Sequence, residues 1–169
     1  QAANKCYDGQ LFFSTTHKVK GADVSNYVAG ANPAWYLLST RRTLKPLIFQ
    51  MRRDLELISK NSVNENNMFW DKQAIWGMDG RYVGGYGFWQ AAFKSKAPLT
   101  EENLAAARAA MRKLTDNKGR RLNIRPDLLI VGPDLETTAS KLLNLQTVST
   151  GGDNVMRNAF DLYVSNFID

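Results

Sequence analysis

The chain has 169 residues, of which 44% are hydrophobic and 22% are charged, and its formal net charge is +6. These values are typical of one globular domain and exclude a disordered or fibrous chain. Cys6 is the only cysteine, which excludes an internal disulfide and a cysteine-based zinc or iron–sulfur site within one chain. No apolar run approaches the roughly 20 residues of a membrane-spanning helix, so we expect a soluble, intracellular protein with no membrane partner.

The first 33 residues are polar and rich in turns. Their short apolar pieces, residues 11–13 and 27–28, are separated by glycines and polar residues, a pattern typical of an extended surface segment. We therefore predict an extended polar lead, residues 1–33, followed by a single domain, residues 34–169. The chain begins with Gln1 and not with methionine, which favours either a processed product or a piece of a longer protein.

The middle of the chain, residues 35–94, is rich in aromatic and β-branched side chains and contains all four tryptophans. Short apolar runs bounded by Pro, Gly, Asn and Asp predict strands at residues 35–38, 47–51, 74–78 and 88–93. The glycine-rich residues 80–87 lack a Gly-Lys-Ser/Thr ending and lead into a strand-like run. We interpret them as a flexible hairpin loop and not as a phosphate-binding loop.

The last third of the chain carries the clearest local signals. Thr100 as an N-cap, followed by Glu101 and Glu102, predicts a helix that the turn at residues 116–119 stops. Further signals predict a buried strand at residues 128–131, a second helix after residues 132–134 and a half-buried strand at residues 160–164. The fold class is therefore α+β, with one mixed sheet of about five or six strands and two or three flanking helices.

Catalytic groupings are missing from the sequence. The single histidine, His17, follows Ser14, Thr15 and Thr16, but a lone histidine beside a lysine is more typical of a surface residue than of a catalytic base. There is no Gly-x-Ser-x-Gly elbow, and the carboxylates show no metal-ligand spacing. We expect no catalytic residue, no metal and no cofactor, and so no enzyme; a hydrolase centred on His17 is the weakest alternative.

The excess positive charge favours an acidic partner such as nucleic acid. The basic residues form small clusters at residues 41–45, 52–53 and 118–125, with acidic residues between most of them, so a solvated face or an ion pair between subunits is the simpler interpretation of each. An alternative function is a basic single-stranded nucleic-acid-binding module, in which aromatic side chains stack on bases; its residues would be Trp70, Trp76, Arg81 and Tyr82.

Four separated motifs resemble, in the family's order, the Mu-like phage and prophage major head subunit gpT. They are Cys6-Tyr7-Asp8-Gly9-Gln10-Leu11-Phe12-Phe13 followed by His17, Leu44-Lys45-Pro46-Leu47-Ile48-Phe49-Gln50 followed by Arg52-Arg53, Gly85-Tyr86-Gly87-Phe88-Trp89-Gln90, and Pro126-Asp127-Leu128-Leu129-Ile130-Val131 followed by Leu135-Glu136. The resemblance covers about residues 5–168. It implies the major-capsid fold of tailed phages, in which an axial domain meets its copies around each capsomer. The chain would begin after the N-terminal arm, the extended loop and the spine helix of that fold, and so be its C-terminal, mostly axial portion.

The resemblance implies a structural subunit that self-assembles into the capsid shell around packaged DNA. It would be found in the virion, and in the bacterial host cytoplasm during assembly. Its partners would be other copies of the subunit, scaffold and portal proteins, and packaged DNA through non-specific contacts. Because aromatic and arginine side chains suit interfaces, the candidate subunit-interface residues are Trp35, Tyr36, Tyr86 and Trp89. The candidate DNA-facing residues are Arg41, Arg42, Arg52, Arg53, Arg120 and Arg121.

Overall fold

The computed structural model describes residues 5–60, 62, 70–146 and 154–168. The chain separates into two compact units, which we call the body (Gln1–Pro46 and Tyr86–Asp169) and the hairpin (Leu47–Gly85). This division differs from the predicted one, because the predicted lead packs within the body while the middle of the predicted single domain separates from it. The division follows the packing: long strands of the middle segment pair with each other, whereas the lead contacts the central sheet.

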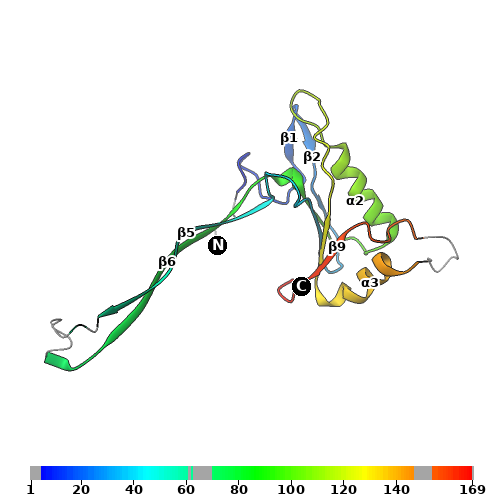
Figure 1. Cartoon of the computed structure of the whole chain (residues 1–169). Coiled ribbons are helices and arrows are strands. Elements are labelled where there is room, and N and C mark those ends of the chain that lie inside the picture. The colour runs from blue at the N-terminus through cyan, green and yellow to red at the C-terminus, as the bar shows by residue number, and fades with distance from the viewer. Residues whose placement is uncertain (1–4, 61, 63–69, 147–153, 169) are drawn as a thin grey trace. The chain divides into compact units, whose positions relative to one another are not determined.

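The body is built on a mixed sheet of five strands, drawn in Figure 1. The strand order is β3 (Tyr27–Val28), β7 (Ala92–Ser95), β4 (Trp35–Leu38), β8 (Leu128–Val131) and β9 (Asp161–Val164). The central strand β4 is antiparallel to both of its neighbours, so that Leu37 lies opposite Phe93 on one side and Leu129 on the other. The outer pairs β3–β7 and β8–β9 are parallel. The predicted α+β fold with a mixed sheet is confirmed.

Two α-helices cover one face of this sheet in the described part of the chain. Helix α2 (Glu101–Lys113) packs beside β7, and helix α3 (Pro133–Asn144) packs beside β8 and β9. The N-cap prediction for α2 is confirmed, since the Thr100 side chain accepts a hydrogen bond from the Asn103 backbone N–H at 3.3 Å. Strand side chains alternate between faces. The helix-facing ones meet the helices in one core, whose fully buried members include Trp35, Leu37, Leu104, Met111, Leu129 and Val131.

The opposite face of the sheet is covered by the lead. Strands β1 (His17–Val19) and β2 (Ala22–Val24) form a small antiparallel ribbon. Phe12 and Val19 from this segment are buried with Leu38, Trp89 and Ala92 in a second core. The prediction of an extended surface segment must therefore be corrected for residues 5–28. These residues form a second packed layer, because the sheet has apolar side chains on both of its faces.

The hairpin unit holds the two longest strands, β5 (Leu47–Lys60) and β6 (Ile75–Tyr86), which pair with each other. The sequence predicts only the first five residues of β5. It also places a loop at residues 80–87, most of which belong to β6. A Cβ added at Gly80 would lie 2.8 Å from the Cδ2 atom of Leu55, so a larger residue at this position would require the exposed Leu55 side chain to shift. The predicted strand at residues 88–93 begins instead with a 3₁₀ turn, η1 (Trp89–Ala91), that leads into β7.

Candidate subunit interface

One face of the hairpin is apolar and exposed. Side chains two residues apart in a strand share a face, so alternate residues of β5 and of β6 line up. The rings of Phe49 and Tyr82 lie 5.8 Å apart across the two strands. The odd-numbered residues of β5 therefore share a face with the even-numbered residues of β6. This apolar face consists of Leu47, Phe49, Met51, Leu55, Leu57, Trp76, Met78 and Tyr82, whose exposed fractions run from 52% to 70%. The other side of β5 is more polar, with Gln50, Arg52, Asp54, Glu56 and Lys60 between the exposed Ile48 and Ile58, and Arg53 is the one charged residue of β5 on the apolar face.

Such a face is unusual for a chain on its own. A two-stranded ribbon is marginally stable in water unless another layer covers its apolar side, and contiguous exposed apolar patches mark contact sites. The sequence analysis missed the face, although its signal is present as a period of two from Leu47 to Leu57. The adjacent charges of Arg52, Arg53 and Asp54 interrupt that period and favour a basic cluster instead.

The structure contradicts the predicted interface role for two of the four aromatic residues. Trp35 is 0% exposed and its Nε1–H donates to the Ala97 carbonyl oxygen at 2.9 Å, and Trp89 is 1% exposed. Both tryptophans are core residues, so their side chains have no surface to offer a neighbour. Tyr36 is half-buried beside Lys94, whose Nζ lies 5.5 Å from its ring centre, and this burial raises the pKa of Tyr36. Tyr86 is 43% exposed.

The six predicted DNA-facing arginines divide into two sets. Three of them line none of the hollows described below. Arg52 and Arg53 lie on the hairpin, where Arg53 forms an ion pair with Asp79. Arg120 forms an ion pair with Asp116 at 3.0 Å. The other three lie beside hollows on the surface of the body. Arg41 and Arg42 line an open hollow of about 590 Å³, and Arg121 lines another that shares Asn123 with it.

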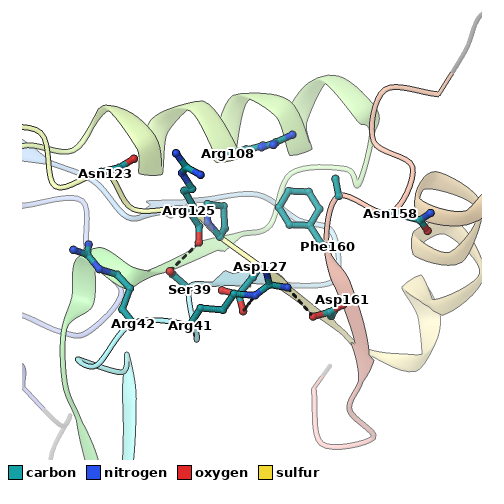
Figure 2. Close-up of a pocket in the computed structure, with 12 residues that line it drawn as sticks. Ser39, Arg41, Arg42, Arg108, Asn123, Arg125, Asp127, Asn158, Phe160 and Asp161 are labelled. Carbon is teal, nitrogen blue, oxygen red and sulfur yellow. Dashed lines mark hydrogen bonds and ion pairs between the residues drawn. The ribbon is translucent and has the colours of Figure 1, made fainter.

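The larger hollow is lined mainly by polar and basic side chains, as Figure 2 shows. At its floor the Asp127 side chain, 11% exposed, accepts a hydrogen bond from the Thr40 backbone N–H at 2.6 Å. Arg41 reaches between Asp127, at 3.8 Å, and Asp161, at 3.9 Å. The Ser39 hydroxyl donates to the Arg125 carbonyl oxygen at 2.8 Å, which ties the loop carrying Arg125 to the end of β4.

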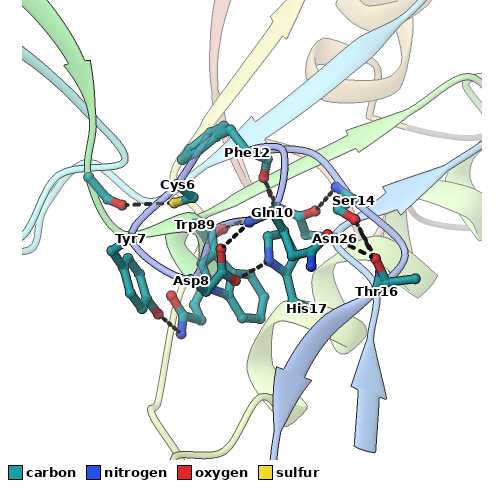
Figure 3. A network of polar contacts seen from close by, with 12 residues as sticks. Cys6, Tyr7, Asp8, Gln10, Phe12, Ser14, Thr16, His17, Asn26 and Trp89 are labelled. Atoms are coloured by element: carbon teal, nitrogen blue, oxygen red, sulfur yellow. Dashed lines mark hydrogen bonds and ion pairs between the residues drawn. The ribbon is translucent and has the colours of Figure 1, made fainter. Parts of the chain in front are cut away.

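His17 belongs to a buried polar network in the lead, shown in Figure 3. Its ring is fully buried and stacks on Trp89 at 3.9 Å, and its Nδ1 atom lies 2.6 Å from an oxygen of Asp8. Beside it, the Asn26 side chain donates to the Phe12 carbonyl oxygen at 2.8 Å. A substrate cannot reach a fully buried imidazole, so His17 serves the packing of the lead against the sheet and not hydrolysis.

The part of the chain that the structure describes shows neither a metal site nor a membrane-spanning helix. Within these residues, no group of three or more His, Cys, Asp or Glu side chains is placed to hold a metal ion. Among the described helices, none combines the length and the apolar character needed to cross a membrane.

The residues of the nucleic-acid alternative are exposed but do not form one platform. Trp76 and Tyr82 lie on the apolar face of the hairpin, whereas Arg81 is adjacent to Tyr82 in β6 and so points to the opposite face. Trp70 precedes β6, outside both strands. The arrangement separates the arginine from the aromatic rings with which it would form a binding groove.

The fold as a whole is that of phage capsid proteins. Solved structures of bacteriophage JBD30 match nearly all of the chain: the procapsid with a TM-score of 0.80 and 35% identity over 96% of this chain, and the capsid with 0.83 and 23% over 97%. In both cases the match covers 58% of the JBD30 chain. The family model of the Mu-like prophage major head subunit gpT matches residues 1–168, and the chain belongs to this family.

The sequences of two relatives support the same assignment. The chain is 33% identical to the major capsid protein of Escherichia phage Mu over 177 residues, a match covering 96% of this chain and 58% of the relative. It is 40% identical to the Mu-like prophage FluMu major head subunit of Haemophilus influenzae over 161 residues, covering 87% of this chain and 52% of the relative. The chain thus spans between half and three fifths of the relatives' length.

Proposed function

We propose that this chain is part of a major head subunit that self-assembles through repeated contacts between copies into the capsid shell of a phage or prophage. The observation that carries the proposal is the match of the gpT family model to residues 1–168. It is supported by the solved JBD30 capsids and by the names of the two relatives. Because the chain covers only part of those relatives, the assembly is a property of the full-length subunit that contains it.

The apolar face of the hairpin supplies a physical reason for assembly. Covering a large apolar side chain contributes about 1.5–3 kcal/mol when it passes from full exposure to burial, and the eight side chains of this face are more than half exposed. A second copy of the subunit is the occupant that fits, since a shell presents the same neighbour to every subunit. Several modest contacts made together then hold each subunit far more firmly than one contact alone.

The remaining parts of the proposal follow from this role. The subunit would be a structural component of the virion, present in the host cytoplasm during assembly, and would carry out no catalysis. Scaffold and portal proteins and packaged DNA are its expected further partners. The JBD30 capsid has been solved decorated with minor capsid protein trimers, and we expect a decorating partner of that kind for this subunit as well.

Negative-stain electron microscopy of the expressed full-length subunit tests the proposal. We expect closed shells of uniform size from the wild type. A charge on the apolar face, introduced as Leu55→Glu or Met78→Glu, should abolish them, while Gln50→Glu on the opposite side of β5 should leave them intact. Wild-type protein that yields only monomers or small oligomers would contradict the shell role. Shells that survive both apolar-face substitutions would contradict the role of the hairpin.

A further inference from the structure

Basic side chains of the body form a continuous track across three adjoining hollows. The first and largest hollow shares Arg108 and Arg125 with a second hollow, and the second shares Arg112 with a third. Together the hollows are lined by six arginines and one lysine, which we call the arginine track: Arg41, Arg42, Arg108, Arg112, Lys113, Arg121 and Arg125. The sequence does not reveal the track, because its members come from three separate segments.

Most of this charge is not neutralised by ion pairs among the residues that the structure describes. Arg41 is the member with carboxylates nearby, at 3.8 and 3.9 Å, and among the described residues no ion pair is found for the other six. Arg108 and Arg112 are four residues apart on α2, where like charges repel across one helical turn. The C-terminal half of a helix offsets part of this repulsion. A surface that accumulates repulsion in this way is suited to an anionic partner.

Two arginine side chains of the track are held in place by contacts within the body. The Arg42 guanidinium donates to the Leu122 carbonyl oxygen at 2.9 Å, and that of Arg108 lies 5.7 Å from the centre of the Phe160 ring. These contacts limit the freedom of long side chains, so less conformational entropy is lost when they bind. Arginine also forms two parallel hydrogen bonds to a phosphate, which suits backbone recognition.

We propose that the arginine track binds the phosphate backbone of double-stranded DNA, an inference that rests on the proposed function because the shell encloses DNA. A track of repeated positive charges fits a polymer of repeated negative charges better than a single small anion, which one hollow would hold. The binding is independent of base sequence, since phosphate contacts carry no sequence information.

The lining of the three hollows favours duplex DNA over other anionic polymers. The one large apolar side chain that lines the three hollows is Phe160, which is buried, so an acidic protein segment would find no apolar anchor of the kind that protein interfaces need. For the same reason the track offers no exposed aromatic ring on which the bases of a single strand would stack. Backbone contact to a duplex requires neither.

The test is fluorescence anisotropy with the 169-residue chain and a labelled 30-base-pair duplex of arbitrary sequence, between 50 and 200 mM NaCl. For each phosphate contact the slope of log Kobs against log salt changes by about 0.9. We therefore expect Arg112→Gln with Arg125→Gln to make the slope shallower by about 1.8. Both side chains are exposed, and unchanged thermal unfolding would verify that the variant is folded. The matched control is Arg52→Gln with Arg81→Gln on the hairpin, which removes the same charge and should leave the slope unchanged.

Equal losses in the two double variants would show that net charge and not the track binds DNA, and would overturn the inference. So would a track variant that binds DNA like the wild type, or poly-glutamate that binds the track when duplex DNA does not. Shell formation by the full-length subunit is measured separately. Absent wild-type shells would overturn the proposed function, whereas intact shells with unchanged DNA binding in the track variant would overturn only the inference.

Discussion

The sharpest prediction for the fold concerns Leu129 in the central sheet. Its side chain is fully buried on β8, between Leu37 of β4 and Leu162 of β9. Replacing a fully buried leucine by alanine removes its transfer free energy and leaves a cavity, and together these cost about 2–5 kcal/mol. Strands on both sides restrict collapse around the cavity, so we expect Leu129→Ala to lower the free energy of unfolding by about 3–4 kcal/mol. In a chain of this size that corresponds to a melting temperature lower by roughly 6–16 °C.

Urea denaturation followed by tryptophan fluorescence measures this effect, because Trp35 and Trp89 are buried and report on both cores. The midpoint should fall while the slope with urea stays constant. Leu57→Ala is the matched control, since the same substitution at a side chain that is 70% exposed should change the free energy by less than about 0.5 kcal/mol. Equal effects of the two substitutions would refute the placement of β8 in the centre of the core. Leu129→Asp should prevent folding altogether, because it buries an unpaired charge.

Three further substitutions or modifications test other parts of the body. Asn26→Ala should cost about 1–3 kcal/mol in urea denaturation, because it leaves the Phe12 carbonyl oxygen and the Ser14 N–H without their side-chain partner; a neutral result would contradict the buried network. Thr100→Ala should cost about 1 kcal/mol through loss of the α2 N-cap, whereas Thr100→Ser should be tolerated. Burial raises the pKa of the Cys6 thiol, so iodoacetamide at pH 8 should label it slowly in the native chain and rapidly in urea; equal rates would show that the thiol is accessible. For the same reason stability should decline as the pH rises above the ordinary thiol value of 9.0, where the unfolded chain loses its proton first.

Elements with local signals are the ones that the sequence predicts well. Helix α2 begins after Thr100 as expected, and α3 begins with Pro133 at its first position, where a missing N–H costs nothing. The apolar run of β8 is likewise recognisable, because a strand covered on both faces contains few polar residues. In each case the information lies within a few neighbouring residues.

Features that depend on distant partners are predicted poorly. Trp35 and Trp89 have the composition of interface residues, but their burial depends on contacts with Ala97 and His17 that no local pattern encodes. The length of β5 is hidden because its outer half is charged on one side, and a paired ribbon needs only one apolar side. The arginine track joins segments whose proximity arises only when β4, β8 and α2 have assembled.

The packing of the lead against Trp89 also has a consequence for folding during synthesis, because the lead is made before the residues that cover it. Asn26 reaches the Trp89 carbonyl oxygen across 63 residues of sequence, and the whole hairpin lies between them. Because a ribosome adds about 5–20 residues per second, the lead waits several seconds for its partner with Phe12 uncovered. Contacts this distant in sequence form late and slow the folding of the domain. Because transiently exposed apolar surface favours aggregation, we expect slower translation of the hairpin to lower the yield of folded subunits.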